Sequence, residues 1–167
     1  MRPIRLIALL FAMLTVAGCA TQDQRFLHYD GPEVTHVLVE KSKRRMYLLH
    51  HGTVLQSHRI DLGFAPDGDK KVQGDGRTPE GDYRIDKRNP NSAFHLSIGI
   101  SYPNRQDIAE AIALGRSPGG DIFIHGEPND WKAKGRDWTE GCIAVTNAEM
   151  RRIYAMVQNG TPIRIKP

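Results

Sequence analysis

One histidine and one cysteine, each beside a glycine, are the residues of this chain best suited to chemistry. His125 ends an apolar run and precedes Gly126, and Cys142 follows Gly141 among small and polar residues. A thiol attacks a carbonyl as its thiolate, and an imidazole within hydrogen-bond reach is the usual means of forming a thiolate near neutral pH. The pair therefore predicts acyl transfer through a cysteine, provided that the fold brings the two side chains together.

The two glycines are expected to complete the machinery of that reaction. Glycine lets the main chain approach a reacting carbonyl closely, so the backbone amides around Gly141 and Cys142 are the expected donors to the oxyanion of the tetrahedral intermediate. The second ring nitrogen of His125 needs an acceptor that fixes its tautomer, and the carbonyl group of Gly126 would serve.

Other roles are open to the same side chains. Cys142 could be an inert buried thiol and His125 a satisfied core histidine. With His95 they could instead form a tetrahedral zinc site with one open position. No ligand pair of the H-x-x-x-H or C-x-x-C kind accompanies them, so neither a metal nor another cofactor is expected.

The surrounding motifs resemble those of the L,D-transpeptidase (YkuD-type) catalytic domain. Residues 124–126 and 138–147 match its pattern of His-Gly followed by Ser/Thr-x-Gly-Cys-Ile/Val, and residues 77–85 are similar to its Thr-Pro-x-Gly-x-Tyr/Phe-x-Ile segment. The resemblance spans about residues 36–166. Many members carry an arginine two residues after the nucleophile, where this chain has Ala144, so it is closest to the subgroup with Gly-Cys-Ile-Ala-Val-Thr-Asn. A substrate-carboxylate contact by that arginine is not carried over.

The resemblance implies a substrate in the bacterial cell wall. Cys142 would attack the carbonyl at the L-centre of meso-diaminopimelate in a peptidoglycan tetrapeptide stem and expel D-alanine, with His125 as proton donor and acceptor. The thioester would pass to another stem's amine, to an amine of an envelope protein or to a free D-amino acid. With water as acceptor the protein would be a hydrolase of stem or protein–peptidoglycan links. A third alternative is an inactive wall-binding lipoprotein of the same fold.

Five residues at or near motif positions are expected to contact the substrate or shape its pocket. They are Tyr83, His95, Trp138, Thr139 and Asn147. His95 could equally lie on the solvated face of its strand, and Asn147 is also explained by the start of a helix.

The N-terminal residues predict export. Arg2 and Arg5 precede an apolar run that is too short to cross about 30 Å of hydrocarbon. Residues 16–19 then resemble a bacterial lipobox, in which Cys19 becomes the lipidated first residue of the mature chain. Because Ala20 rather than Asp follows, the protein is expected in the periplasm, anchored to the outer membrane. Ordinary cleavage and an uncleaved anchor are the alternatives.

The composition suits a single exported catalytic domain. Two of the 23 Lys and Arg residues lie in the signal, which leaves 21 against 19 Asp and Glu, a net charge of +2. Basic residues are spread along the chain without an aromatic-interleaved stripe, so nucleic acid is not expected as a partner.

If Cys19 carries a lipid, Cys142 has no intramolecular disulfide partner, which favours a catalytic thiol. The expected division is residues 1–18 as signal peptide, 19–33 as tether and 34–167 as catalytic domain.

Hydrophobic patterning predicts a mainly β fold with two short helices, and the resemblance implies a mixed β-sandwich. Strands are expected at residues 36–40, 45–50, 53–62, 82–86, 93–101, 121–125 and 161–166. The first helix is expected at residues 104–114, with an apolar face of Ile108, Ala111, Ile112 and Leu114. The second follows a capping box at Thr146 and Glu149 and carries a core stripe of Met150, Ile153, Tyr154 and Val157 before Asn159 and Gly160.

Two loops are expected to lie over the cleft. Residues 63–80 are rich in Gly, Asp, Pro and Lys, and residues 126–138 follow the His-Gly pair. Either loop could be a lid, and a fixed structural loop is equally compatible with residues 126–138. Residues 41–45 form the densest basic run of the chain, which is interpreted as a solvated strand end.

Overall fold

The computed structural model describes residues 25–133 and 135–167. The expected signal peptide, the expected lipidation site Cys19 and the first part of the expected tether lie outside these residues. Within them, no helix is both long and apolar enough to cross a bilayer.

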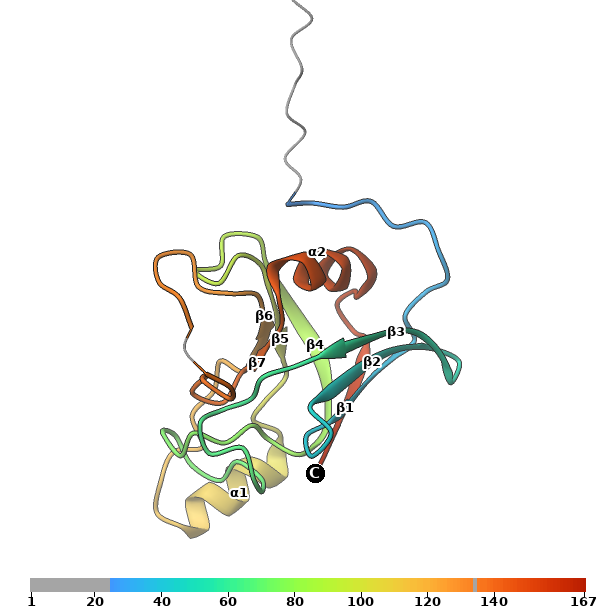
Figure 1. Cartoon of the computed structure of the whole chain (residues 1–167). Coiled ribbons are helices and arrows are strands. Elements are labelled where there is room, and N and C mark those ends of the chain that lie inside the picture. The colour runs from blue at the N-terminus through green and yellow to red at the C-terminus, as the bar shows by residue number, and fades with distance from the viewer. Residues whose placement is uncertain (1–24, 134) are drawn as a thin grey trace, which may run out of the picture.

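A mixed sheet forms the body of the protein (Figure 1). In the part of the chain that the structure describes, eight strands follow the spatial order β3-β2-β1-β8-β4-β5-β6-β7. Their bounds are β1 His36–Glu40, β2 Arg45–His50, β3 Thr53–Arg59, β4 Gly81–Asn89, β5 Ser97–Ile100, β6 Phe123–His125, β7 Ile143–Ala144 and β8 Pro162–Lys166. The prediction of a mainly β fold with two helices is confirmed.

The pairing of the strands explains why the sheet is mixed. The first three strands form the antiparallel meander predicted from the sequence. β8 then pairs parallel to β1 and antiparallel to β4, so the end of the chain joins the meander to the rest of the sheet. Beyond β5, β6 and β7 run parallel to each other. β4 is therefore the strand shared by the two halves of the sheet.

Helix α2 (Asn147–Met156) begins and packs as the sequence predicts. The Thr146 hydroxyl accepts a hydrogen bond from the Glu149 amide, and the Glu149 carboxylate accepts one from the Thr146 amide, which completes a capping box. The apolar stripe is buried at Met150, Ile153, Tyr154 and Val157. The helix packs against β5 and β6, but it ends at Met156 rather than near Asn159. Since α2 starts directly after β7, it fixes the end of the segment that carries the cysteine.

Helix α1 (Arg105–Ala113) is present as predicted, but most of its apolar face is not covered by another element. Its N-cap is Asn104, and the helix ends before Gly115. The predicted apolar face is largely in solvent, with exposed fractions of 41% at Ile108, 68% at Ile112 and 58% at Leu114. The helix is instead attached through a polar contact, because the Tyr83 hydroxyl donates to the buried carboxylate of Asp107 at 3.1 Å.

Several strand bounds differ from the sequence-based expectation, and β6 begins two residues later than predicted. β3 ends before residues 60–62, and β4 extends beyond the predicted range at both ends. β5 covers only residues 97–100 of the predicted range 93–101, because residues 93–95 form a turn, in which His95 has φ +66°. β7 was not predicted at all. A two-residue strand in a Gly-rich segment has too short a pattern to be recognised.

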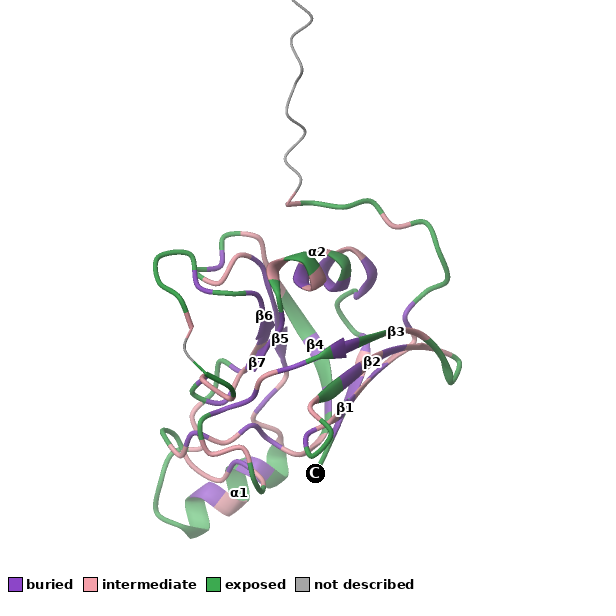
Figure 2. Ribbon diagram, in the orientation of Figure 1, coloured by how far each residue is buried: buried purple, intermediate pink, exposed green. Residues whose placement is uncertain are grey.

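The core lies between the two halves of the sheet and under α2, where Figure 2 shows continuous purple segments. Ile98, Ile124, Ile143 and Met150 are each fully buried there. The strand that leads to His125 is therefore held on both sides by close packing. A side chain at the end of such a strand has a fixed position and can still face an opening.

Lys41 fixes the loop at residues 63–80 to the meander. The side chain is 2% exposed, and its ammonium group donates to the carbonyl of Gly68, to the carbonyl of Thr78 at 2.9 Å and to the carboxylate of Glu80 at 2.8 Å. The interpretation of residues 41–45 as solvated is therefore wrong for Lys41. A buried ammonium needs acceptors for all three protons, and the turns of this loop supply them.

Candidate active site

The parallel pairing of β6 and β7 brings the predicted histidine and cysteine to one place. Ile124 lies opposite Ile143, and His125 lies opposite Ala144, the second residue after Cys142. Both His125 and Cys142 line a cleft of about 510 Å³, which is called the catalytic cleft below. The sequence alone could state that the two side chains had to meet. The strand pairing explains why both side chains line one cleft.

His125 is held in one orientation. The imidazole is 3% exposed, and Nδ1 lies 2.7 Å from the carbonyl oxygen of Gly126. Since a carbonyl only accepts, Nδ1 carries the proton and Nε2 is left as the basic nitrogen. Burial lowers the pKa of His125, although the Gly126 carbonyl opposes this shift. The ring is therefore neutral near pH 7 and able to accept a proton.

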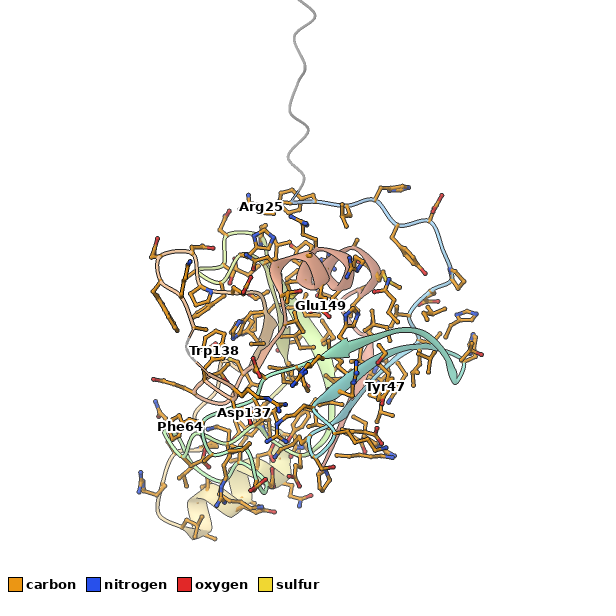
Figure 3. All side chains as sticks on the ribbon, viewed as in Figure 1. Arg25, Tyr47, Phe64, Asp137, Trp138 and Glu149 are labelled. Atoms are coloured by element: carbon orange, nitrogen blue, oxygen red, sulfur yellow. The ribbon has the colours of Figure 1, made fainter. Side chains whose placement is uncertain are left out.

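Aromatic side chains surround this imidazole. The ring centroid of Phe94 lies 4.5 Å from that of His125, and the Trp138 centroid lies 5.6 Å from it in an edge-to-face arrangement. Trp131 stacks edge-on against Trp138 at 5.4 Å. Figure 3 labels Trp138, which projects from the segment that leads to the cysteine. These rings account for the burial of the histidine and line the cleft beside it.

The Cys142 thiol is partly buried and bonds to main-chain groups of the neighbouring strand. The amide of Phe123 donates to Sγ at 3.4 Å, and Sγ donates to the carbonyl of Asp121 at 3.6 Å. Burial raises the pKa of Cys142, while the Phe123 amide and the charge of Lys70 lower it by smaller amounts. Both shifts thus favour the neutral forms of the thiol and the imidazole.

The turn before the cysteine depends on Thr139 and Gly141. The Thr139 hydroxyl donates to the Cys142 carbonyl at 2.7 Å and accepts from the Gly141 amide at 3.2 Å. Gly141 has φ +131°, and a Cβ there would lie 2.7 Å from the carbonyl oxygen of Arg77. Only glycine fits this position. Because its amide is engaged by Thr139, Gly141 could donate to an oxyanion only by sharing or leaving that bond.

Lys70 is the cation of the cleft and was not predicted. The side chain is 4% exposed and donates to the carboxylate of Asp75 at 2.9 Å and to the carbonyl of Val72 at 3.2 Å. It lines the catalytic cleft together with two acidic residues, Asp121 and Glu140. A lysine in a Gly- and Asp-rich loop gives no periodic signal, so only the path of residues 63–80 reveals its place.

Three of the five predicted substrate contacts lie elsewhere. The residues that line the cleft in the described part of the chain include Trp138 and Thr139 but not Tyr83, His95 or Asn147. Tyr83 is buried against α1, and the Asn147 side chain accepts from the Glu127 amide at 2.8 Å. These three residues therefore lie outside the cleft lining, where they support the elements around it.

Asn147 and His95 both pack against Gly126, the glycine after His125. A Cβ at Gly126 would lie 2.4 Å from Asn147 Oδ1 and 3.1 Å from the Cβ of His95. The His95 amide in turn donates to the Asn129 side chain at 3.0 Å, which fastens the loop at residues 126–133 to the turn before β5. The carbonyl that orients His125 is therefore set by close packing from both directions.

The described residues contain no group of three or more His, Cys, Asp or Glu side chains placed to hold a metal ion. The arrangement that would join His95, His125 and Cys142 around zinc is not formed, since His95 lies in the turn outside the cleft.

Sites that place a thiol and a neutral imidazole in one cleft are typical of cysteine acyltransferases and hydrolases, and the cleft of this protein has that composition. Comparison with known families narrows the class: residues 34–165 match the YkuD family, the L,D-transpeptidase catalytic domain. The chain belongs to this family, which confirms the resemblance seen in the sequence.

Individual relatives share the fold and part of the sequence. A protein of Escherichia coli (strain K12) named "Putative L,D-transpeptidase YafK" is 29% identical over 106 residues, which are 62% of this chain and 37% of that protein. The crystal structure of the helical cell shape determining protein Pgp2 from Campylobacter jejuni is 28% identical with a TM-score of 0.63, and the match covers 87% of this chain and 51% of Pgp2. L,D-transpeptidase 1 of Mycobacterium tuberculosis has the same fold, with a TM-score of 0.52 at 14% identity over 81% of this chain and 62% of that one. The chain thus spans between about a third and two thirds of the length of these relatives.

Proposed function

We propose that this protein is a peptidoglycan L,D-transpeptidase that uses Cys142 as nucleophile and His125 as proton donor and acceptor. The observation that carries the proposal is that both side chains line one cleft, with Nε2 of His125 left as the basic nitrogen by the Gly126 carbonyl. Membership of the L,D-transpeptidase family supports a wall substrate. The bond attacked would be the one between diaminopimelate and D-alanine in a tetrapeptide stem.

The reaction begins from a neutral pair. His125 takes the thiol proton of Cys142 as the sulfur attacks the stem carbonyl, so that a C–S bond forms and the carbonyl oxygen becomes an oxyanion. The tetrahedral intermediate then collapses, the C–N bond to D-alanine breaks, and His125 returns the proton to the departing amine. A thioester on Cys142 remains. The acceptor amine repeats these steps in reverse order, and His125 again moves the proton.

The oxyanion needs a donor at the cysteine turn. The amide of Cys142 is the group of the turn nearest the reacting atom, and the amide of Gly141 already donates to Thr139. We assign the first donor role to Cys142 itself, with Gly141 contributing as its bond to Thr139 lengthens. Removal of one such donor typically reduces kcat by about 10²-fold or more.

Lys70 is the candidate for binding a carboxylate of the stem. Ala144 is 3% exposed in β7 and lines a neighbouring hollow rather than the catalytic cleft, so no cation reaches the substrate from that position. Lys70 reaches the cleft from the loop at residues 63–80, and Asp75 and Val72 occupy two of its three protons. The third is available to a substrate carboxylate.

The acceptor distinguishes the alternatives. An amine of a second stem, of an envelope protein or of a D-amino acid gives transfer, and water gives an L,D-hydrolase. The aromatic rings around His125 restrict water at the proton-transfer site, which supports transfer. We further propose that the protein acts in the periplasm and is held at the outer membrane by a lipid on Cys19.

Product analysis tests the proposal. The purified chain is incubated with sacculi, with and without a D-amino acid, and the muropeptides are analysed by mass. Transfer predicts tetrapeptides that carry the added D-amino acid in place of D-alanine, whereas shortened stems alone indicate hydrolysis. The variant Cys142→Ala should give neither product. Unchanged muropeptides with the wild-type protein, or equal products with Cys142→Ala, would refute the enzymatic role and leave the inactive wall-binding lipoprotein.

A further inference from the structure

A second hollow lies beside residues 136–137, which precede Trp138 and the turn before Cys142. Basic side chains line most of it. Its volume is about 540 Å³. Its charged residues are Lys43, Arg44, Arg45, Arg59, Arg136 and Asp137, and they define the cationic hollow. The β1–β2 turn, the end of β3 and the segment before Trp138 all contribute. Segments distant in sequence therefore bring five cations and one carboxylate to one place.

The single carboxylate of the cationic hollow, that of Asp137, already accepts hydrogen bonds from other groups of the protein. Arg44 Nε lies 3.0 Å and 3.1 Å from the two carboxylate oxygens of Asp137, and the Leu62 amide also donates to this carboxylate at 3.0 Å. Arg44 and Asp137 both have left-handed backbones, with φ of 49° and 51°. Such backbones are unfavourable at residues other than glycine, so the pair belongs to a built structure rather than to a chance surface contact. Asp137 is therefore already engaged by Arg44 and the Leu62 amide, and it also interacts with the nearby charge of Arg136.

Arg45 and Arg59 are exposed and lie directly opposite each other in the β2–β3 pairing. Like charges in that position destabilise a sheet. Within residues 25–133 and 135–167, no carboxylate lies within ion-pair distance of Arg45, Arg59 or Arg136. Lys43 differs, because it pairs with Glu40 at 2.9 Å. Three guanidinium groups therefore border the cationic hollow outside any ion pair, although the charge of Arg136 also acts on the Asp137 carboxylate that Arg44 holds.

We propose that the cationic hollow binds a phosphate group. A guanidinium presents a planar fork of donors that matches phosphate and carboxylate oxygens, and hydrogen bonds between such charged groups are the strong ones. A lone carboxylate brings one negative charge to three guanidinium groups, whereas a phosphate brings up to two charges and more acceptor oxygens. The charge count thus favours phosphate. The group can be free, or it can belong to the headgroup of a lipid.

The cationic hollow is separate from the catalytic cleft but adjoins it by way of two residues. Arg59 also lines an intermediate hollow, and Trp138 lines both that hollow and the cleft. Figure 3 shows Asp137 and Trp138 on the same side of the molecule. A phosphate bound at Arg59 and Arg136 would therefore lie next to the cleft and leave Cys142 accessible.

A simpler explanation of the arginine pair makes the opposite prediction. β3 is an edge strand of the sheet, and charges on edge strands prevent pairing with a second molecule. If that were the whole role of Arg45 and Arg59, their removal would cause self-association and would leave phosphate affinity unchanged.

The test compares the full-length protein with Arg45→Gln/Arg59→Gln and with a control, Arg105→Gln/Arg116→Gln. The control removes the same charge from two exposed arginines at the ends of α1. Calorimetric titration with inorganic pyrophosphate should show saturable binding that weakens by about tenfold or more in the first variant, since hydrogen bonds between charged groups are lost. The control should bind as the wild type does. The thermal midpoint of the first variant should not fall, because a repulsion is removed.

Sedimentation with vesicles separates the two sources of phosphate. Vesicles of phosphatidylglycerol that bind the wild type and the control, but not Arg45→Gln/Arg59→Gln, identify a lipid headgroup. Selective pyrophosphate binding without vesicle binding identifies a free or soluble phosphate. The proposal is overturned if the wild type binds neither probe or if both variants lose binding equally. It is also overturned if the first variant associates while its pyrophosphate affinity is unchanged.

Discussion

Replacement of Lys41 by methionine tests how the loop at residues 63–80 is held. Lys41 forms three hydrogen bonds from a site that is 2% exposed, and one of them is an ion pair with Glu80, whose side chain is 18% exposed. Methionine fills a similar volume but supplies no donor. The Thr78 carbonyl and the Glu80 carboxylate would then be left without the ammonium.

The expected loss in the free energy of unfolding follows from the Glu80 carboxylate that remains partly buried without the ammonium. Removing one partner of a buried ion pair costs about 3 to 5 kcal/mol, because the other charge is left uncompensated. That loss is a large fraction of the roughly 5 to 15 kcal/mol that stabilises a typical domain. The double variant Lys41→Met/Glu80→Met removes both charges and should recover part of the loss.

Urea unfolding followed by tryptophan fluorescence measures these differences. Lys43→Met is the matched control, since this neighbouring lysine is 63% exposed and pairs only with Glu40. It should leave the unfolding midpoint unchanged. A Lys41→Met variant that loses less than about 1 kcal/mol, or a double variant less stable than the single one, would show that the ammonium does not hold the loop.

Three further changes probe the cleft. Because burial lowers the pKa of His125, kcat/KM should stay high below pH 6.5 and fall only at more acidic pH. Because burial raises the pKa of Cys142, alkylation of the free protein by iodoacetamide should increase up to and beyond pH 9.0. An alkylation profile with its midpoint near pH 7 would contradict the neutral pair. Lys70→Met should raise KM for a tetrapeptide donor by about tenfold or more, with Lys70→Arg restoring part of it; an unchanged KM would remove Lys70 from carboxylate binding. Gly141→Ala should abolish D-alanine release, since its Cβ would meet the Arg77 carbonyl at 2.7 Å; a variant with near-normal release would show that the turn can relax.

The sequence predicts those parts of the fold that have local patterns. The strands from His36 to His50, and the capping box and core stripe of α2, follow from alternation, helical spacing and capping chemistry. The apolar residues of α1 follow the same helical spacing, but they face solvent because polar contacts attach that helix. Spacing shows which residues share a face and does not show whether another element covers it.

The candidate site divides in the same way. His125 and Cys142 carry distinctive chemistry beside glycines, so their types and spacing single them out. Lys70, Phe94 and Trp131 come from loops and a turn whose paths depend on tertiary contacts, and the sequence gives no local sign that they reach the cleft. Lys41 was misjudged for a related reason. A lysine in a basic run has the pattern of a solvated residue until distant carbonyl groups are found around it.

The most direct test of the catalytic role is the mass of the protein during turnover. The wild-type chain is mixed with a disaccharide tetrapeptide donor, quenched in acid and measured intact. The thioester mechanism predicts an added mass equal to the donor less D-alanine, which digestion locates on the peptide that contains Cys142. The adduct should be absent from Cys142→Ala, and His125→Ala should slow its appearance. D-Alanine release without this adduct, or an adduct that forms equally fast in His125→Ala, would contradict the central claim.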